Sequence, residues 1–373
     1  MSTLLELDAR QGVPPGFTEL AEEIYGDDPH WIPEERTQLD FLFSERNAFF
    51  DRGEGRIFFR PQKIRGATFF DPLAREENKK VAFFGFFEST GDGQEEERLF
   101  GAMEAWAREK GATSLVGPID FGTFGRNRFR LRAIDKGVPF LGEPYNQEAY
   151  SGAVERLGYR RCSQAITQIS SGEQMSMVWR TRLDRLERLE AEGFRFLALT
   201  PELWLSNRAE LHGLINRMFA QNYGFAPISE RLFLQACGES YIRRTDRECS
   251  VIAFSPEGQI GGFFLVYPHW GPLLVAGAGE ARVAPGELSF DDHFETLRAK
   301  GSLGGVFKTG AVAPEYRRRD LFSALTIWTF RAGEGRYDEW YGALVREDNP
   351  SRRYADKVSV DSRWYSLFKR ELF

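Results

Sequence analysis

Three consecutive arginines, Arg317 to Arg319, stand in a chain whose net charge is −6. They separate an apolar run that ends at Val312 from an amphipathic segment that begins at Leu321. The start of a helix has unpaired N–H groups and the positive end of the helix dipole, so cations there are unfavourable unless an anion binds. The segment therefore predicts an anion-binding loop. The alternative is a solvated helix start that Asp320 caps.

A second group of residues that could take part in chemistry lies in the first half of the chain. Glu88 ends an apolar, strand-like run, and a carboxylate there could accept a proton. The segments "GPIDF" and "PYNQEAY" follow, and the Gly-Pro pair predicts a shaped turn. The residues that could bind a substrate are Pro118, Phe121, Tyr145, Asn146 and Tyr150. Asn146 could equally cap a helix that starts at Gln147.

The elements that must position these residues form an internal repeat. "LFGAMEAWAREKG", from Leu99, and "LFSALTIWTFRAG", from Leu321, align without a gap. Their apolar spacing is typical of a helix that packs one face on a sheet. Strand-like runs flank both segments, so the order strand–helix–strand occurs twice, which indicates a duplicated domain. We expect an α/β chain, of the α+β kind, with domains at residues 1–172 and 173–373.

The two copies of this helix differ in the charge that precedes them. The first copy follows Glu95, Glu96 and Glu97, where the second follows the three arginines. Carboxylates at a helix start stabilise the helix and repel a phosphate, whereas arginines attract one. We therefore expect only the second half to bind an anion, and the first half to have kept the fold and lost that site.

Composition excludes several classes of function. An acidic chain lacks the broad basic face of a duplex-binding protein. The three cysteines form no CxxC pair and the four histidines have no metal-ligand spacing, so neither a metal site nor a disulfide framework is predicted. The N-terminus has no signal-peptide pattern, and prolines interrupt the most apolar segment. We expect a cytoplasmic monomer or homodimer that does not cross a membrane.

From Val312 onward the second half resembles the acyl-coenzyme-A-binding core of the GCN5-related N-acetyltransferase superfamily. The residues that match the motif of that superfamily are Val312, Pro314, Arg317 and Leu325. Asp320 and Phe322 stand where the motif has glycines. "FGFFE", "GPIDF" and "PYNQEAY" in the first half, with "QNYGFAPIS" in the second, resemble a bacterial group with two such domains in tandem. The resemblance implies that each domain is a twisted, mostly antiparallel mixed sheet flanked by helices.

The resemblance also implies an activity. It is the transfer of an acyl group from acetyl-CoA, another acyl-CoA or a carrier-protein thioester to the amine of a small molecule or amino acid. The donor would contact Val312, Arg317, Arg318, Arg319, Leu321 and Asn349. Tyr354 is the candidate acid, and Glu315 and Glu88 are candidate bases. Two alternatives stay open: a transferase that uses aminoacyl-tRNA, and a non-catalytic small-molecule-binding protein, which the missing glycines favour.

Overall fold

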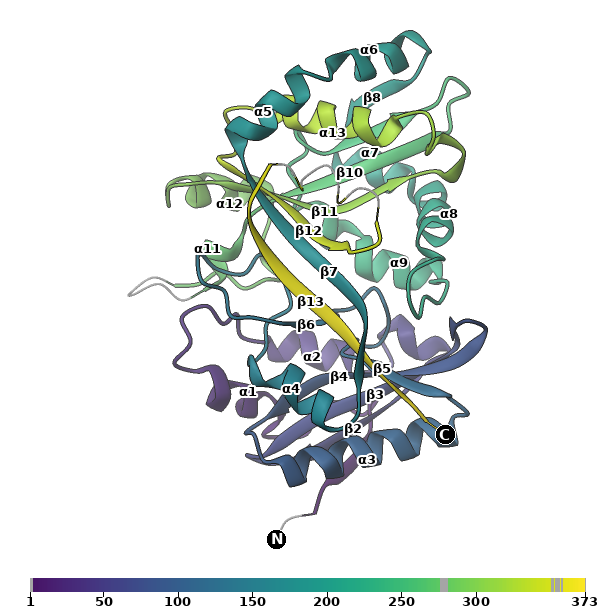
Figure 1. The fold of residues 1–373 in the computed structure, drawn as a ribbon, viewed down its shortest axis with the longest axis vertical. Helices are drawn as coiled ribbons and strands as arrows, with labels where there is room; N and C mark the ends of the chain where they lie inside the picture. Colours follow the sequence, from purple (N-terminus) through teal and green to yellow (C-terminus); the bar gives the residue numbers. More distant parts are fainter. Residues whose placement is uncertain (1–2, 276–280, 350–351, 353–355, 357, 373) are drawn as a thin grey trace.

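The computed structural model describes residues 3–275, 281–349, 352, 356 and 358–372 of the chain (Figure 1). The strands of these residues form one sheet of 13 strands, in the order β1-β2-β3-β4-β5-β13-β7-β12-β11-β10-β9-β8, with β6 paired to β13. This sheet and the helices that flank it confirm the predicted combination of a mostly antiparallel mixed sheet with flanking helices.

None of the described helices is long and apolar enough to cross a membrane.

The first half supplies one end of the sheet. Its strands are β1 (Leu5–Asp8), β2 (Glu54–Arg60), β3 (Ile64–Glu76), β4 (Lys79–Ser89), β5 (Ser114–Gly117), β6 (Phe129–Arg130) and β7 (Arg160–Ser171). Its helices are α1 (Phe17–Tyr25), α2 (Arg36–Leu42), α3 (Gly93–Glu109) and α4 (Ala149–Arg156), with a 3-10 turn η1 (Ala48–Asp51). The strands β1 to β4 are antiparallel, whereas β4 and β5 are parallel and α3 connects them.

The second half supplies the other end. Its strands are β8 (Arg195–Ala198), β9 (Val251–Phe254), β10 (Ile260–Pro268), β11 (Gly304–Val312), β12 (Glu339–Arg346) and β13 (Ser359–Glu371). Its helices are α5 (Gly172–Arg180), α6 (Leu183–Ala191), α7 (Pro201–Ser206), α8 (Arg208–Phe219), α9 (Glu230–Cys237), α10 (Glu239–Ile242), α11 (Gly271–Leu274), α12 (Phe290–Arg298) and α13 (Leu321–Ala332), with a 3-10 turn η2 (Pro314–Tyr316). The strands β11 and β12 are parallel and α13 connects them. The predicted repeat of strand, helix and strand is thus confirmed.

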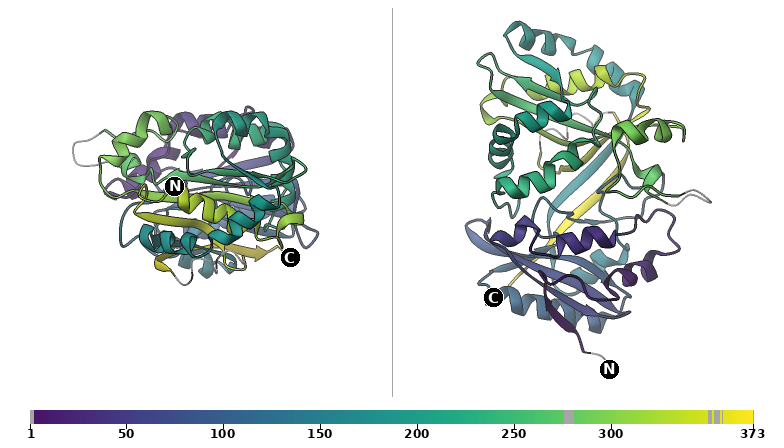
Figure 2. Two further views of the ribbon diagram at one scale, coloured as in Figure 1. Left: turned by 90° about the horizontal axis from the view of Figure 1, so that it is seen from above. Right: turned by 180° about the vertical axis from the view of Figure 1, so that it is seen from behind.

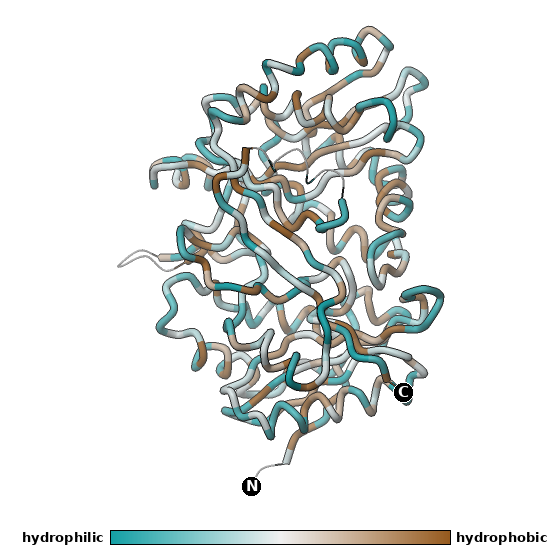
Figure 3. Tube along the Cα trace, in the orientation of Figure 1, coloured by the Kyte–Doolittle hydropathy of each residue, from teal (hydrophilic) through white to brown (hydrophobic). Residues whose placement is uncertain are grey.

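The two central helices form because their apolar residues recur on one face. The side chain of Asp92 caps α3 by accepting from two backbone N–H groups of its first turn. The residues that α3 buries include Leu99, Phe100, Met103 and Trp106. Those that α13 buries include Leu321, Ala324, Leu325 and Ile327. Both helices therefore cover the sheet, α3 mainly over β2 and β3 and α13 mainly over β9 and β10. Hydrophobic residues recur along the strands of the sheet in Figure 3.

A two-stranded ribbon of β7 and β13 joins the halves. The final strand β13 passes back along β7 and ends beside β5 of the first half, antiparallel to both (Figures 1 and 2). At the other edge of β7 lies β12. The sheet is consequently continuous across residue 172, and the last strand pairs with the sheet of the first half. The division into domains at 1–172 and 173–373 stays a prediction.

Candidate functional site

The parallel strands β11 and β12 separate halfway along their length. Their pairing ends at Phe307 and Gly342. Directly afterwards Lys308 is the extra residue in the pairing of β11 with β10, and β12 shifts register against β7. Leu344 has a positive φ of 52° in this part of β12. A bulge bends a strand and increases its twist, so both strands turn away from one another at this point.

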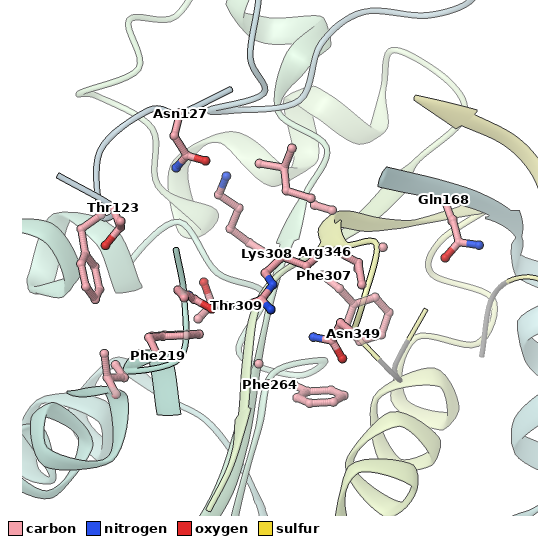
Figure 4. A pocket seen from close by; sticks show the side chains of 18 of the residues that line it. Thr123, Asn127, Gln168, Phe219, Phe264, Phe307, Lys308, Thr309, Arg346 and Asn349 are labelled. Carbon is pink, nitrogen blue, oxygen red and sulfur yellow. Dashed lines mark hydrogen bonds between the residues drawn. The ribbon is translucent and has the colours of Figure 1, made fainter. Parts of the chain in front are cut away.

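A cavity of about 480 Å³ lies at this separation, and we call it the strand cavity. Its lining comes from β11, β12, α13, helices α7 to α10 and the loop of residues 119–128 (Figure 4). The aromatic residues of its wall include Phe264, Phe307, Phe322, Phe330 and Trp340. The charged residues of its lining are Arg128, Lys308 and Arg346, and the described lining contains no carboxylate. A cavity with cations and an apolar wall suits an anionic ligand that carries an apolar chain.

Arg128 is a cation of this lining that has no carboxylate partner among the described residues. One of its terminal nitrogens donates to Asn127 Oδ1 and the other to Ser163 Oγ at 3.4 Å, but within the described chain it forms no ion pair and its buried Nε has no hydrogen-bond partner. Burial, together with the charge of Arg346, lowers the pKa of Arg128 to about 10. Its φ is +77°, a conformation that favours glycine and is often found at functional sites. An anion in the strand cavity would offset this charge.

The start of α13 has no side-chain cap. Asp320 occupies the N-cap position with a φ of +61°, and its side chain makes no hydrogen bond to the helix. Its carboxylate lies 3.1 Å from Arg188 of α6 instead. The interpretation of Asp320 as a capping residue is therefore wrong, because α6 holds its side chain away from the helix end.

The residues predicted to contact the donor lie in three places. The three arginines Arg317 to Arg319 are exposed on the loop before α13 and do not line the strand cavity, and the last of them lies 2.5 Å from Glu192. Val312, the last residue of β11, and Leu321, the first residue of α13, are both buried in the core between α13 and the sheet. Asn349 lines the strand cavity. The roles of these residues stay predictions.

The corresponding place in the first half is filled by the chain itself. After β5 the backbone returns to β4, where Ile119 N donates to Phe84 O at 2.7 Å. The carboxylate of Asp120 accepts from Phe86 N at 3.0 Å. The turn contains the Gly117–Pro118 peptide, which is cis. The gap between β4 and β5 is thus occupied by residues 117–120.

A second cavity, of about 800 Å³, lies between the two halves, and we call it the interface cavity. Of the predicted substrate-binding residues, Phe121 and Tyr145 line it, as does Glu88. Pro118, Asn146 and Tyr150 lie outside its lining. The residues that line both cavities are Thr123, Phe124, Gly125, Ala236, Tyr241 and Lys308. The strand cavity and the interface cavity therefore meet.

Glu88 is the centre of a buried polar network on the wall of the interface cavity. The hydroxyls of Tyr25 and Tyr150 each donate to its Oε2 at 2.8 Å. Arg65 lies 3.7 Å from its other oxygen and 2.8 Å from Glu34. Burial raises the pKa of Glu88 to about 7, although Arg65 acts in the opposite direction. A carboxyl group with a pKa near neutrality is suited to proton transfer.

Two other candidates in the first half have structural contacts. Asn146 Oδ1 accepts from Arg130 N at 2.7 Å and its Nδ2 donates to the carbonyl of the same residue at 3.2 Å. The N-cap of α4 is Glu148, so the capping interpretation of Asn146 is wrong: its amide is used by β6. The hydroxyl of Tyr145 donates to Asp28 at 2.5 Å. Glu315 is exposed in η2, and Tyr354 lies outside the described residues.

Sequence reasoning missed Lys308, Arg128 and Arg346. Lys308 had a signal, because "GGVFKTGAV" places a single charged residue inside an otherwise uncharged strand. Arg128 had none, since it is one of several arginines in "GRNRFRLR". The described residues contain no group of three or more metal-ligating side chains placed to hold a metal ion.

Replacing Glu88 with glutamine is expected to make stability less dependent on pH. In the unfolded chain the carboxyl loses its proton near its ordinary pKa of 4.5, whereas in the folded protein it keeps it to about 7. The unfolded state then binds fewer protons, so the free energy of unfolding falls as pH rises through this window. Glutamine avoids a loss of about 3 kcal/mol between pH 4.5 and 7. Urea denaturation at pH 5 and pH 8 measures it, with exposed Glu97→Gln as the control.

No protein-family model matches the chain. Protein YghO of Escherichia coli (strain K12) is 24% identical over 229 residues, which are 58% of this chain and 56% of that protein. A bacterial ceramide synthase of Caulobacter vibrioides is 25% identical over 224 residues, 57% of each chain. The matched region thus spans a little over half the length of these curated relatives.

Two solved structures align with the whole chain. A tandem GCN5-related acetyltransferase protein from the clavulanic acid biosynthesis pathway has a TM-score of 0.50 at 11% identity, over 100% of this chain and 99% of that one. A conserved protein of Enterococcus faecalis V583, described as a probable N-acyltransferase, has a TM-score of 0.54 at 9% identity, over 100% and 73%. At these identities the likeness is one of fold. The chain has the tandem fold of the GCN5-related N-acetyltransferases, as the sequence predicted.

Proposed function

We propose that the protein is an N-acyltransferase that binds a thioester donor in the strand cavity and transfers its acyl group to an amine. The observation that carries this proposal is the strand cavity itself, with three cations, no carboxylate in its described lining and an aromatic wall. Acyl-CoA and the phosphopantetheine arm of a carrier protein both combine phosphate with an apolar thioester. The cations would bind the phosphate and the wall would bind the chain.

The proposal places the donor at the parallel strands of the second half and not at those of the first. In the first half residues 117–120 occupy the space between β4 and β5. The N-terminus of α3 is also unsuited to binding a phosphate, because Asp92 caps it and Glu95 and Glu96 lie in the first turn of the helix. In the second half the corresponding space is open and the helix end has no side-chain cap. The first half then serves as a wall of the site.

The acceptor amine would occupy the interface cavity. Among the described residues, six acidic and four basic side chains line that cavity, which favours a cation. Glu35 is among the acidic ones, and its buried Oε1 has no hydrogen-bond partner within the described chain. One curated relative is named a ceramide synthase, and ceramides are amides of a fatty acid with a long-chain amino alcohol. An acceptor with an ammonium group and an apolar body fits both observations.

The reaction forms a C–N bond and breaks a C–S bond. The ammonium group of the acceptor first releases one proton to solvent. The neutral amine then attacks the thioester carbonyl, the tetrahedral adduct collapses, and a thiolate leaves. One proton must leave the nitrogen and one must reach the sulfur, so the products are an amide and a thiol. Cations beside the carbonyl oxygen stabilise the negative charge that it gains in the adduct.

A direct test incubates the full-length protein with acyl-CoA donors of two to sixteen carbons and a panel of primary amines. Amide products are identified by mass spectrometry, and donor binding is followed as a rise in melting temperature. An amide from at least one pair, together with a rise for its donor, is expected. If no thioester raises the melting temperature and no amide forms, the protein is not an acyltransferase of this kind.

Replacing Arg128 with methionine is expected to weaken donor binding by about 10- to 100-fold. The estimate corresponds to the loss of one charged hydrogen bond in a shielded site, about 1.5–3 kcal/mol. Stability should change little or rise, because a buried cation without an ion pair is removed. Exposed Arg132, just beyond β6, provides the control, Arg132→Ala. Isothermal titration with the best donor measures both, and equal affinities would remove Arg128 from the donor site.

A further inference from the structure

Lys308 occupies the point where the two cavities meet. It is the bulged residue of β11, directly after the last residue of that strand that pairs with β12. Its side chain lines the strand cavity and the interface cavity alike. In Figure 4 it extends from β11 in the direction of Asn127. A donor in one cavity and an amine in the other would therefore reach each other beside this side chain.

The amino group of Lys308 has no ionic partner. Within the described chain it forms no ion pair and no hydrogen bond, and its Nζ lies 5.5 Å from the centre of the Phe140 ring. The carboxylate whose charge acts on it is Glu143, which is already bound by Arg363 at 2.7 Å and by the Tyr365 hydroxyl. Burial lowers the pKa of Lys308 to about 8 in spite of Glu143. About a tenth of the lysine is consequently neutral at pH 7.

The other charged groups around the two cavities leave this environment unchanged. Those on the strand side are Arg128 and Arg346. The cations on the interface side are Arg52, Arg126 and Arg244, and the carboxylates are Glu34, Glu35, Asp71, Glu88 and Asp120. Beside Lys308, the hydroxyls of Tyr241 and Thr309 are 2.8 Å apart and hydrogen-bond to each other. Two tyrosines hydrogen-bond to Glu88, which lines the interface cavity but not the strand cavity. Glu88 therefore cannot transfer a proton between groups in the two cavities.

We propose that Lys308 is the proton-transfer residue of the reaction, taking a proton from the amine in the interface cavity and passing it to the thiolate that leaves the strand cavity. This inference rests on the proposed acyl transfer. In the first step neutral Nζ accepts a proton as the amine nitrogen bonds to the carbonyl carbon. In the second the C–S bond breaks, and the Lys308 ammonium protonates the sulfur. Lys308 ends in its neutral form, ready for another cycle, so the protons balance.

The substitution Lys308→Arg distinguishes two roles of this residue: transfer of a proton, and electrostatic stabilisation by its positive charge. Arginine keeps the positive charge and cannot be deprotonated in a protein, so it retains electrostatic stabilisation and loses proton transfer. We expect kcat to fall at least 100-fold in Lys308→Arg and in Lys308→Met, with the dissociation constant of the donor changed less than threefold in the arginine variant. The kcat of the unsubstituted protein should rise with pH to a plateau above about 8, and this limb should be absent from both variants. A kcat within threefold of the unsubstituted protein in Lys308→Arg would overturn the proposal.

A second measurement does not depend on activity. Competitive labelling with trace acetic anhydride, read by mass spectrometry, reports the pH at which each lysine becomes nucleophilic. Lys308 should reach half of its maximal labelling near pH 8, more than two pH units below the ordinary lysine value of 10.5. Exposed Lys136 controls for the reactivity of the reagent. A saturating donor should slow the labelling of Lys308 alone. If Lys308 reaches half of its maximal labelling near the ordinary lysine value of 10.5, it is not the base, whether or not the protein forms amides. If Lys308 titrates near pH 8 and is protected by a donor but no amine is acylated, the proposed acyl transfer fails and this role fails with it.

Discussion

Gly342→Phe is expected to abolish donor binding and amide formation while the protein stays folded. Gly342 is the residue of β12 at which the pairing with β11 ends, and it lines the strand cavity. A Cβ placed there would lie 3.7 Å from Gln168 O. Apart from Gly342 and the residues on either side of it, no other described residue has an atom within 4 Å of that position. Its φ lies outside the range that only glycine adopts easily. A phenylalanine is therefore tolerated by the backbone, and its ring must take space from the strand cavity.

The matched control is Gly101→Phe on the exposed face of α3, where an added Cβ meets no described atom within 4 Å. Both variants should melt within about 3 °C of the unsubstituted protein, because neither forces a backbone change. Only Gly342→Phe should lose the rise in melting temperature with acyl-CoA, and its rate of amide formation should fall below detection. Unchanged donor affinity in Gly342→Phe would place the donor outside the strand cavity and return attention to the arginines before α13.

The sequence predicted what local pattern determines. The helices α3 and α13 were predicted because two segments of the chain share the same apolar spacing, and the strands that flank them were predicted from the same repeat. The parallel pairing of these strands is a finding of the structure. The place of β13 could not be found in this way. It pairs Phe368 with Gly117, and no local pattern tells a terminal strand which of two similar sheets it will join. The continuous sheet across residue 172 could therefore not be predicted together with the two domains.

The site was predicted less completely than the fold. Asn349, Glu88, Phe121 and Tyr145 line the two cavities, but they were chosen for their chemistry and their place along the chain. The cations of the strand cavity come from different halves, so their convergence exists only in three dimensions. Phe322 illustrates the same limit. It stands where the motif has a small residue, and its ring packs on Phe264 with centres 5.0 Å apart while lining the cavity. The residue that departs from the motif, Phe322, thus forms part of the wall of the strand cavity.

A buried ion pair between the first half and β13 gives the second prediction with a large expected effect, which is on the free energy of unfolding. Glu143, in a loop of the first half, accepts from Arg363 at 2.7 Å, from the Tyr365 hydroxyl and from Phe140 N at 3.0 Å. All three side chains of this cluster are buried, and two of them belong to β13. Breaking a buried ion pair by removing one partner leaves the other charge without compensation. We expect Glu143→Ala to lower the free energy of unfolding by about 3–5 kcal/mol.

Urea denaturation with a double-mutant cycle separates the ion pair from the packing. Glu143→Leu alone and Arg363→Met alone should each be strongly destabilising, whereas the double variant Glu143→Leu with Arg363→Met should recover part of the loss, because no unpaired charge remains buried. Exposed Glu148→Ala in the same segment should change stability by less than about 0.5 kcal/mol. Strict additivity would mean that the two side chains do not act as a pair. Because Glu143 also raises the pKa of Lys308, Glu143→Gln should shift the labelling of Lys308 to lower pH. A contact that aligns the halves would then also set the protonation of the residue between the two cavities.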